Sequence, residues 1–301
     1  METLELLKRK IKTAEDLQSV VKTMKALAAV NIRQYEKAVE SLAEYNQTVE
    51  MGLQILLRKR PEAVALFKLE PTNRLGAIVF GSDQGMCGQL NDQIVSHAME
   101  TMDNLGIEPK NRTLLAVGLR VTGRFEDIGQ PVEECLSVPG STAGITPMVQ
   151  EVAMTIEEWH SRRKIDQVVL FYNRHLSRTL YRPHMLRLLP LDLEWLRNLE
   201  RKKWPTRVLP TFTMDRNRLF SSLIHQYLFV SLYRAFAESL ASENASRLAS
   251  MQGAERNIEE RLGELNLQFH QQRQMSITEE LLDIVSGFTA LTSEEDTKLV
   301  S

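Results

Sequence analysis

The placement of proline and glycine constrains the fold of this 301-residue chain more than any other feature. All ten prolines lie between Pro61 and Pro210. Residues 1–60 contain one glycine, Gly52, and residues 215–286 contain only Gly253 and Gly263. Because proline breaks helices and glycine weakens them, we expect a long helix at each end and a compact region between them.

Apolar residues recur at alternating steps of three and four in both end segments, which is typical of a coiled-coil seam. The first series includes Leu4, Leu7, Ile11, Ala14, Leu17, Val21, Met24 and Ala28, and the second includes Leu219, Leu223, Tyr227, Val230, Tyr233, Ala237 and Leu240. Helices of ~55 and ~70 residues would span roughly 80 and 105 Å, more than a globular core requires. We therefore predict that the two helices pack on each other, antiparallel, or on a partner.

The middle of the chain alternates strand and helix signals. Strands are predicted at 75–80, 113–117 and 166–172. Helices are predicted at 91–103 and 146–162, the second with Pro147 in its first turn after a loop at 140–144. This alternation indicates an α/β fold with a central parallel sheet. The predicted domains are an N-terminal helix at 1–60, a central Rossmann-like α/β domain at 61–210 and a C-terminal helix at 211–301.

Composition argues against several classes of protein. The formal net charge is −2 with the two signs interspersed, so the clusters 58–60 and 201–203 are interpreted as solvated loop charges rather than a nucleic-acid footprint. Two cysteines do not form a disulfide scaffold, which favours a reducing compartment. No signal or transit peptide is recognised, and the most apolar stretch, 219–236, carries His225 and Arg234. We expect any membrane association to be peripheral.

The segment from Phe80 to Asn91 follows a predicted strand and precedes a predicted helix, where α/β enzymes bind phosphates. Its glycines at 81, 85 and 88 match neither G-x-G-x-x-G nor a Walker A loop, and Ser82 is not in a nucleophile elbow. Cys87 is either a nucleophile near a helix N-terminus or a small buried residue in a tight turn. The six histidines show no metal-ligand spacing. We predict no catalytic residue, no cofactor and no metal.

Three separate motifs carry a family resemblance. The segment Phe80-Gly-Ser-Asp-Gln-Gly-Met-Cys-Gly88 is similar to the FGSDRGLCGGLN stretch of ATP synthase gamma subunits. The runs Ser242–Leu248 and Arg273–Leu281 resemble that family still more closely. The N-terminal segment adds Gln18, Lys22, Met24, Ala28 and Arg33. The chain thus resembles the gamma subunit of F-type ATP synthases.

Several residues depart from the family pattern. Asn31 stands where the family usually has Lys, Glu255 where it has Thr, and Glu279 where it has Gln or Asn. The stretch Trp204–Pro210 replaces the family's Trp-Asp-Tyr-x-x-Glu-Pro, with loss of acidic and aromatic contacts toward the membrane rotor. These departures point to a divergent branch, such as the alternate F-type ATPases.

The resemblance implies a central rotor stalk without catalytic residues, in which rotation couples ion flow through a membrane ring to ATP synthesis or hydrolysis. The implied partners are the alpha and beta subunits of the catalytic ring, the epsilon subunit and the membrane c-ring, with no nucleic acid. The implied location is peripheral, on the cytoplasmic face of a prokaryotic cell membrane. Carried over residue by residue, the implied contacts to the catalytic ring are Met24, Lys25, Arg247, Gln274, Thr278 and Glu280. A structural salt bridge or a solvated position is an equal alternative for Lys25.

The segment Leu281–Phe288 is apolar on most faces. This composition suits a hydrophobic sleeve that acts as a bearing, and the alternative is a terminal helix packed on its own core. Two other functions compete with the rotor. A nucleotide-binding enzyme with long dimerisation helices would require a phosphate loop. A coiled-coil scaffold with a catalytically silent α/β domain would leave the three ordered motifs unexplained.

Overall fold

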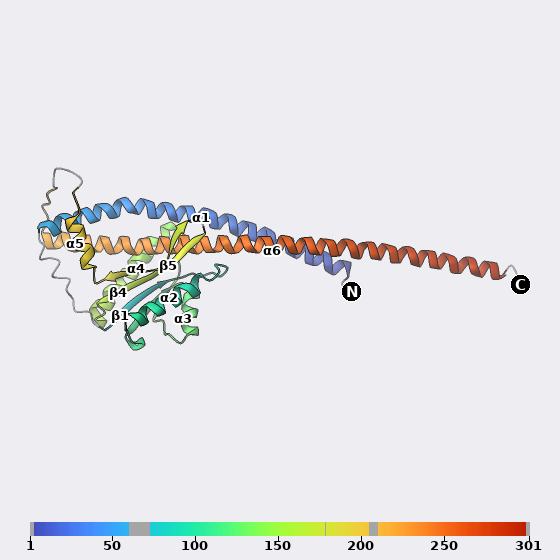
Figure 1. Cartoon of the computed structure of the whole chain (residues 1–301), viewed down its shortest axis with the longest axis horizontal. Coiled ribbons are helices and arrows are strands. Elements are labelled where there is room, and N and C mark those ends of the chain that lie inside the picture. The colour runs from blue at the N-terminus through green and yellow to red at the C-terminus, as the bar shows by residue number, and fades with distance from the viewer. Residues whose placement is uncertain (1–2, 60–72, 178, 205–209, 299–301) are drawn as a thin grey trace. The chain divides into compact units, whose positions relative to one another are not determined.

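A computed structural model describes residues 3–59, 73–177, 179–204 and 210–298 of the chain (Figure 1). Helix α1 covers Leu4–Lys59 and helix α6 covers Arg216–Lys298, which confirms the two predicted end helices. Contacts group the chain into two compact units, one formed by residues 1–26 and 251–301 and the other by residues 27–250. The domain boundaries predicted near residues 60 and 210 stay a prediction.

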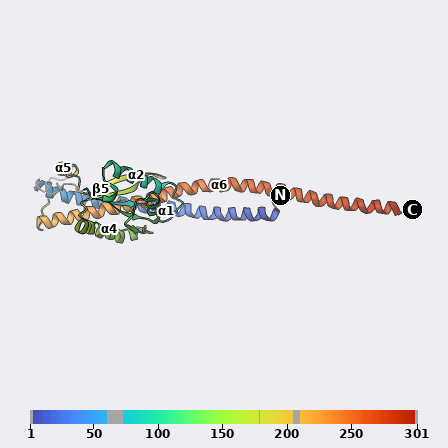
Figure 2. The same cartoon turned by 90° about the horizontal axis from the view of Figure 1, so that it is seen from below.

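In the first unit, the starting segment of α1 lies beside the later part of α6 (Figure 2). Gln18 Nε2 donates a hydrogen bond to Glu259 Oε1 at 3.5 Å. Seven residues further along α1, Lys25 pairs with Glu255. A later residue of α1 therefore contacts an earlier residue of α6, which shows that the two segments are antiparallel. Leu7, at 3% exposure, belongs to the buried seam between them.

The same antiparallel order continues within the second unit. Asn31 Nδ2 donates to Asn244 Oδ1 at 3.3 Å, and Tyr45 OH donates to Gln226 Oε1 at 2.7 Å. Gly52 is the one glycine of α1, and a Cβ at this position would lie 3.0 Å from Leu223 Cδ2. The small residue therefore lets the two helices approach closely.

The second unit also holds a five-stranded sheet in the order β3-β2-β1-β4-β5. The strands are β1 Leu75–Phe80, β2 Arg112–Val117, β3 Glu134–Leu136, β4 Gln167–Ser177 and β5 Leu180–Leu189. Strands β1 to β4 run parallel, which confirms the predicted α/β sheet, whereas β5 pairs antiparallel with β4. The sheet is therefore mixed rather than purely parallel.

Strand β5 was not predicted because its sequence contains a proline, Pro183, and charged residues interrupt its apolar run. Proline cannot donate to a β ladder and is tolerated mainly at sheet edges. Strand β5 is at an edge of this sheet, which explains why the proline is accommodated.

The described part of the second unit also holds four shorter α-helices: α2 Leu90–Asn104, α3 Leu119–Asp127, α4 Thr142–Arg163 and α5 Leu193–Arg201. Helices α2, α3 and α4 pack on the sheet, whereas α5 packs on α1 and α6. The predicted start of α4 was wrong, because the helix begins at Thr142 rather than 146 and Pro147 lies beyond the first turn. Because Pro147 has no N–H, the hydrogen bond to the carbonyl of Ala143 cannot form. This position is close to the helix start, where several N–H groups lack a helical partner in any case, so the proline is tolerated. The predicted loop through Gly144 is correspondingly shorter.

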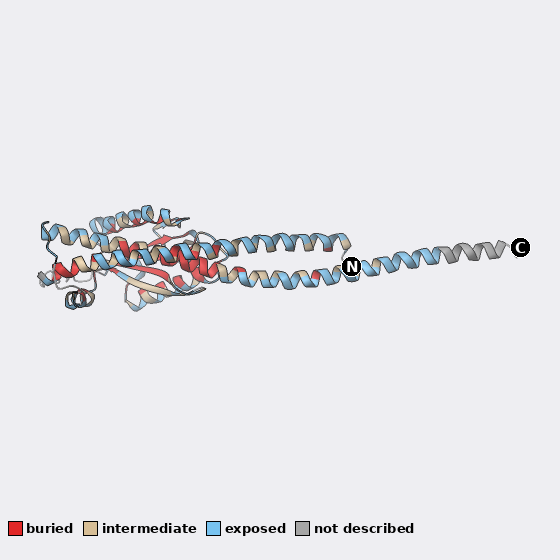
Figure 3. Ribbon diagram, turned by 90° about the horizontal axis from the view of Figure 1, so that it is seen from above, coloured by how far each residue is buried: buried red, intermediate tan, exposed pale blue. Residues whose placement is uncertain are grey.

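The sheet is covered on both faces. One face packs against α4 and α6 through a core that includes Phe80, Trp159 and Phe236. The other face packs against α2 and α3, with Phe125 and Phe171 fully buried. A third cluster joins α1, α5 and α6. Figure 3 shows the burial of α6 concentrated where it passes along the sheet.

Two features from the sequence fall partly outside the described residues: Arg60 of the first basic cluster, and residues 205–209 of the Trp204–Pro210 stretch. None of the helices in the described ranges combines the length and apolar character needed to cross a bilayer.

Candidate functional site

Helix α6 fills the crevice where α/β proteins commonly bind ligands. That crevice lies beyond the carboxyl ends of the strands at which the strand order reverses, here β1 and β4. Ser242 Oγ of α6 donates to the carbonyl of Asn173 on β4 at 2.7 Å, and Ser246 Oγ donates to the carbonyl of Cys87 after β1 at 2.5 Å. The space is therefore taken by packing between α6 and the sheet.

The Gly81–Gly88 loop that follows β1 is held by polar side chains of the loop and by Asn91 of α2. Asn91 Nδ2 donates to Ser82 Oγ at 2.9 Å, and Asn91 Oδ1 accepts from the backbone N–H of Ser82 at 3.0 Å. Cys87 Sγ lies 3.4 Å from Ser82 Oγ, and both residues are buried. These contacts are those of a fixed turn, in which neither Ser82 nor Cys87 faces solvent.

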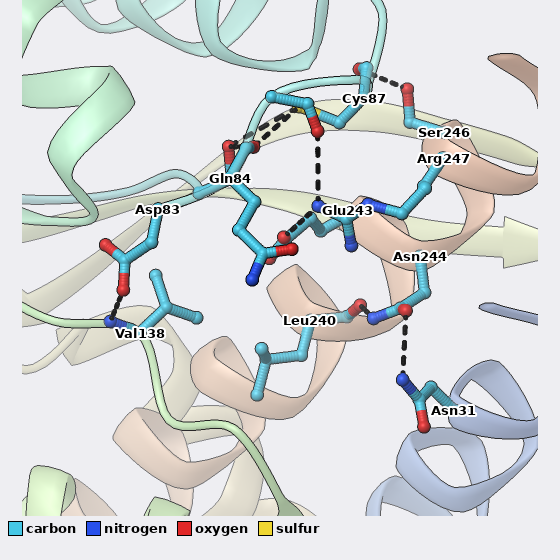
Figure 4. Close-up of polar contacts among 12 residues, drawn as sticks. Asn31, Asp83, Gln84, Cys87, Val138, Leu240, Glu243, Asn244, Ser246 and Arg247 are labelled. Carbon is cyan, nitrogen blue, oxygen red and sulfur yellow. Dashed lines mark hydrogen bonds and ion pairs between the residues drawn. The ribbon is translucent and has the colours of Figure 1, made fainter. Parts of the chain in front are cut away.

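Asp83 ties this loop to two neighbouring segments. Its two carboxylate oxygens accept hydrogen bonds from the backbone N–H groups of Leu119 and Val138, each at 2.9 Å. Figure 4 shows the bond to Val138. The first of these bonds satisfies a free N–H at the start of α3.

Arg247 faces this loop from α6 (Figure 4). Its Nη2 lies 2.7 Å from Glu243 Oε1 and donates to the carbonyl of Gly85 at 3.5 Å. Only 11% of the Arg247 side chain and 8% of the Glu243 side chain are exposed. Burial raises the pKa of the Glu243 carboxyl, and the adjacent guanidinium partly offsets that rise. Arg247 is thus engaged inside its own chain.

Met24 and Lys25 lie on α1 in the first unit, and both are half-buried. Lys25 Nζ forms an ion pair with Glu255 Oε2 of α6. The structural salt bridge that the sequence left open for Lys25 is therefore present.

Gln274, Thr278 and Glu280 lie close together on the late part of α6, and all three are exposed. Thr278 Oγ1 donates to the carbonyl of Gln274 at 2.9 Å. Large apolar side chains are exposed in the same stretch, namely Ile277 at 48%, Leu281 at 57%, Leu282 at 60% and Ile284 at 69%. Figure 3 colours the late described part of α6 mostly as exposed.

Five of the six predicted contact residues therefore belong to the first unit, and Arg247 belongs to the second. Sequence reasoning missed Ser242, Ser246 and Asn173 as the residues that close the crevice. The run Ser242–Ser246 carried a usable signal, because small polar residues inside an otherwise apolar helix seam indicate a buried polar contact. Within the described ranges, no cluster of three or more His, Cys, Asp or Glu side chains could hold a metal ion.

These features define a protein built on an antiparallel pair of terminal helices, with an α/β domain packed onto both of them. A family model described as ATP synthase matches residues 3–291. The chain belongs to this family, as a gamma subunit, which is a non-catalytic subunit of the ATP synthase central stalk.

Curated relatives agree over nearly the whole length. The ATP synthase gamma chain of Syntrophus aciditrophicus is 29% identical, with 97% of this chain and 99% of the relative covered. That of Nostoc punctiforme is 28% identical, with 97% and 100% covered.

Solved structures show the same fold. A chain from the Euglena gracilis mitochondrial ATP synthase OSCP/F1/c-ring structure aligns with a TM-score of 0.65 and 16% identity, covering 97% of this chain and 95% of that one. A chain from the Tetrahymena thermophila central stalk/c-ring structure aligns with a TM-score of 0.56 and 21% identity, covering 78% and 99%.

Proposed function

We propose that this gamma subunit is the rotor that couples ion flow through a membrane c-ring to ATP synthesis or hydrolysis in a ring of alpha and beta subunits. The observation that carries the proposal is the exposed apolar stretch of α6 around Leu281, Leu282 and Ile284. Contiguous exposed apolar side chains mark surfaces that a partner covers. A hydrophobic sleeve in the catalytic ring is the partner that this surface fits.

The exposed polar residues beside that stretch support contacts to the catalytic ring. Gln274, Thr278 and Glu280 are exposed and offer hydrogen-bonding groups to a partner. Met24 and Lys25 form the proposed mid-shaft contact with the moving levers of the catalytic subunits. For Arg247, its burial and its pair with Glu243 favour a role in holding the Gly81–Gly88 loop.

The remaining partners and the location follow from the same proposal. The epsilon subunit and the c-ring bind the part of the rotor nearest the membrane, and the complex lies on the cytoplasmic face of a prokaryotic cell membrane. Assignment to an alternate F-type branch stays a prediction that rests on Asn31, Glu255, Glu279 and the Trp204–Pro210 stretch.

Affinity purification of the tagged chain from its native cells tests this function. We expect two homologous nucleotide-binding subunits to co-purify in equal amounts, together with a small subunit and, in detergent, the c-ring. A coiled-coil scaffold would instead recover unrelated partners.

The purified chain alone should neither bind nor hydrolyse ATP, because α6 occupies the crevice between β1 and β4. Equilibrium dialysis with ATP and a phosphate-release assay measure both properties. Turnover by the pure chain would favour the enzyme alternative.

A further inference from the structure

The second unit contains a cavity of about 550 Å³ among residues of α1, β4, β5, α5 and α6. Cavities of ~300–1,000 Å³ are typical of small-molecule sites in proteins. None of the described residues that line it belongs to the Gly81–Gly88 loop or to the run Ser242–Ser246. The cavity is therefore separate from the crevice that α6 fills.

Aromatic rings form much of its wall. The rings of Trp195 on α5 and Tyr227 on α6 pack with their centroids 4.7 Å apart, and the ring of Tyr172 on β4 meets that of His184 on β5 at 5.2 Å. Burial raises the pKa values of Tyr172 and Tyr227 and lowers the pKa of His184. Shifts of this kind mark surroundings that are poor in water, where an aromatic ligand is well accommodated.

Two arginines on the cavity wall share one buried carboxylate. Arg234 Nε donates to Glu238 Oε1 at 2.8 Å, whereas Arg174 Nε lies 3.8 Å from Glu238 Oε2, which makes no hydrogen bond within the described residues. The glutamate side chain is 6% exposed, but those of Arg174 and Arg234 are 40% and 48% exposed. Because a guanidinium group carries five N–H donors, both arginines have donors left for a ligand carboxylate.

The two ends of the cavity differ in chemistry. Tyr45 of α1 is hydrogen-bonded to Gln226 of α6, so the antiparallel helices place Glu40 toward Arg234 and away from Tyr227. Arg234 follows Tyr227 by seven residues, or roughly 10 Å along the helix. Glu40 is exposed and lines the cavity. One end therefore carries charges of both signs, and the other carries aromatic rings.

Glu50 lies at the aromatic end and is already engaged within the chain. Its Oε1 accepts a hydrogen bond from Asn46 Nδ2 at 2.8 Å, and its Oε2 lies 3.9 Å from Lys202 Nζ. The aromatic end therefore has no uncompensated carboxylate among the described residues.

We propose that this cavity binds a small aromatic zwitterion, of the class of the aromatic α-amino acids. The ligand carboxylate accepts hydrogen bonds from Arg174 and Arg234, its ammonium group faces Glu40, and its ring lies toward Tyr227. The charges of Arg174, Arg234, Glu238 and Glu40 sum to zero, so a ligand that carries both signs matches this end better than an anion or a cation does. The inference goes beyond the rotor function and does not depend on it.

Equilibrium dialysis of the full chain with radiolabelled L-phenylalanine tests the proposal. We expect saturable binding of one molecule per chain. Competition by 3-phenylpropionate, which lacks the ammonium group, and by 2-phenylethylamine, which lacks the carboxylate, should be weaker by roughly 10-fold or more, as the loss of a charge-assisted hydrogen bond produces. Absence of saturable binding at millimolar concentrations, or equal competition by either analogue, would overturn the proposal.

Two variants locate the bound molecule. Arg174→Gln should weaken binding by roughly 10-fold, because one carboxylate donor is lost while Arg234 still pairs with Glu238. Ala43→Phe should abolish binding, because Ala43 is exposed on α1 and lines the cavity, so a ring there fills the mouth without entering the core. Thermal melts check that both variants fold. Unchanged binding in either folded variant would place the ligand elsewhere and refute the assignment.

Arg162→Gln is the matched control. It breaks an exposed ion pair with Glu158 on α4, with the two side chains 76% and 50% exposed, and neither residue lines the cavity. We expect no change in the affinity for L-phenylalanine. A loss equal to that of Arg174→Gln would show that binding follows the overall charge of the chain, which contradicts a site in this cavity.

Discussion

At the scale of single residues, the junction between α6 and the Gly81–Gly88 loop depends on buried polar groups that satisfy one another. Ser246 bonds the loop carbonyl at Cys87, and Arg247 bridges Glu243 to Gly85. A buried polar group without a partner costs more free energy than the same bond contributes when made. We therefore expect removal of one partner of the Arg247–Glu243 pair to lower the unfolding free energy more than replacement of both partners by uncharged residues.

Cys87→Ala tests whether the thiol has a chemical role. Cys87 is 2% exposed and fills the turn beside Ser82. We expect a loss of about 1 kcal/mol in unfolding free energy and nearly unchanged ATPase activity of the assembled complex. Urea unfolding and a phosphate-release assay give the two values. Complete loss of activity in a folded, assembled complex would point to a catalytic or redox role.

Glu243→Gln tests the buried ion pair through its pH dependence. Because burial raises the pKa of Glu243, the stability contributed by its protonated form is fully present below the ordinary glutamate pKa. That contribution is lost as pH rises through the raised, folded-state pKa. The wild-type chain should therefore lose stability relative to the glutamine variant as pH rises from about 4 toward neutrality.

Urea unfolding at several pH values measures this difference. Arg247→Met provides the contrast, because it leaves the carboxylate buried without its cation and should cost about 3 kcal/mol near neutral pH. If the unfolding free energies of the wild-type and Glu243→Gln chains change with pH in parallel, the pKa of Glu243 is the same in the folded and unfolded chains, which contradicts the prediction.

At the scale of elements, the junction between β2 and α3 requires a residue without a side chain. Gly118 has φ +120°, and a Cβ there would lie 2.8 Å from backbone atoms of Ser82. The close approach brings the start of α3 against the loop after β1, where Asp83 accepts from Leu119 N–H. One glycine thus sets the geometry of two connected segments.

Gly118→Ala should lower the unfolding free energy by at least ~2 kcal/mol, from backbone strain and the clash with Ser82. Gly123→Ala, inside helix α3 and five residues after Gly118, is the control. Nothing lies within 4 Å of a Cβ at Gly123, so alanine should stabilise the helix by about 0.5–1 kcal/mol. Equal effects of the two substitutions in denaturant melts would contradict this account of Gly118.

At the scale of the whole molecule, the chain combines a helix pair with an α/β domain, and α6 is hydrogen-bonded to β4 and to the loop after β1. The two ends of the chain supply the helix pair, and the middle supplies the sheet. In the proposed rotor, torque passes through contacts that must hold the partner without binding it too strongly at any one angle. Added charge at the mid-shaft is therefore expected to affect coupling before it affects folding.

Met24→Lys places a second ammonium group beside Lys25, without a matching carboxylate. A new ion pair with an acidic lever of the ring would deepen one rotary state by about 1–3 kcal/mol if partly desolvated. Vesicles carrying the variant should hydrolyse ATP but pump ions poorly. If pumping and hydrolysis fall in strict proportion, Met24 is an ordinary seam residue.

The sequence by itself determined the helical ends, the alternating α/β middle and the family. Proline-free segments with apolar residues at steps of three and four specify helices through local geometry, and the strands centred on Ile78, Leu115 and Leu170 are short apolar runs. The tertiary structure alone decided that α6 packs against the loop after β1 and that Lys25 pairs with Glu255. Both depend on contacts between residues far apart in sequence, such as Ser246 with Cys87, and no local periodicity encodes such a contact. Strand β5 follows β4 directly in the chain, but only the structure showed that it joins the sheet as an antiparallel edge.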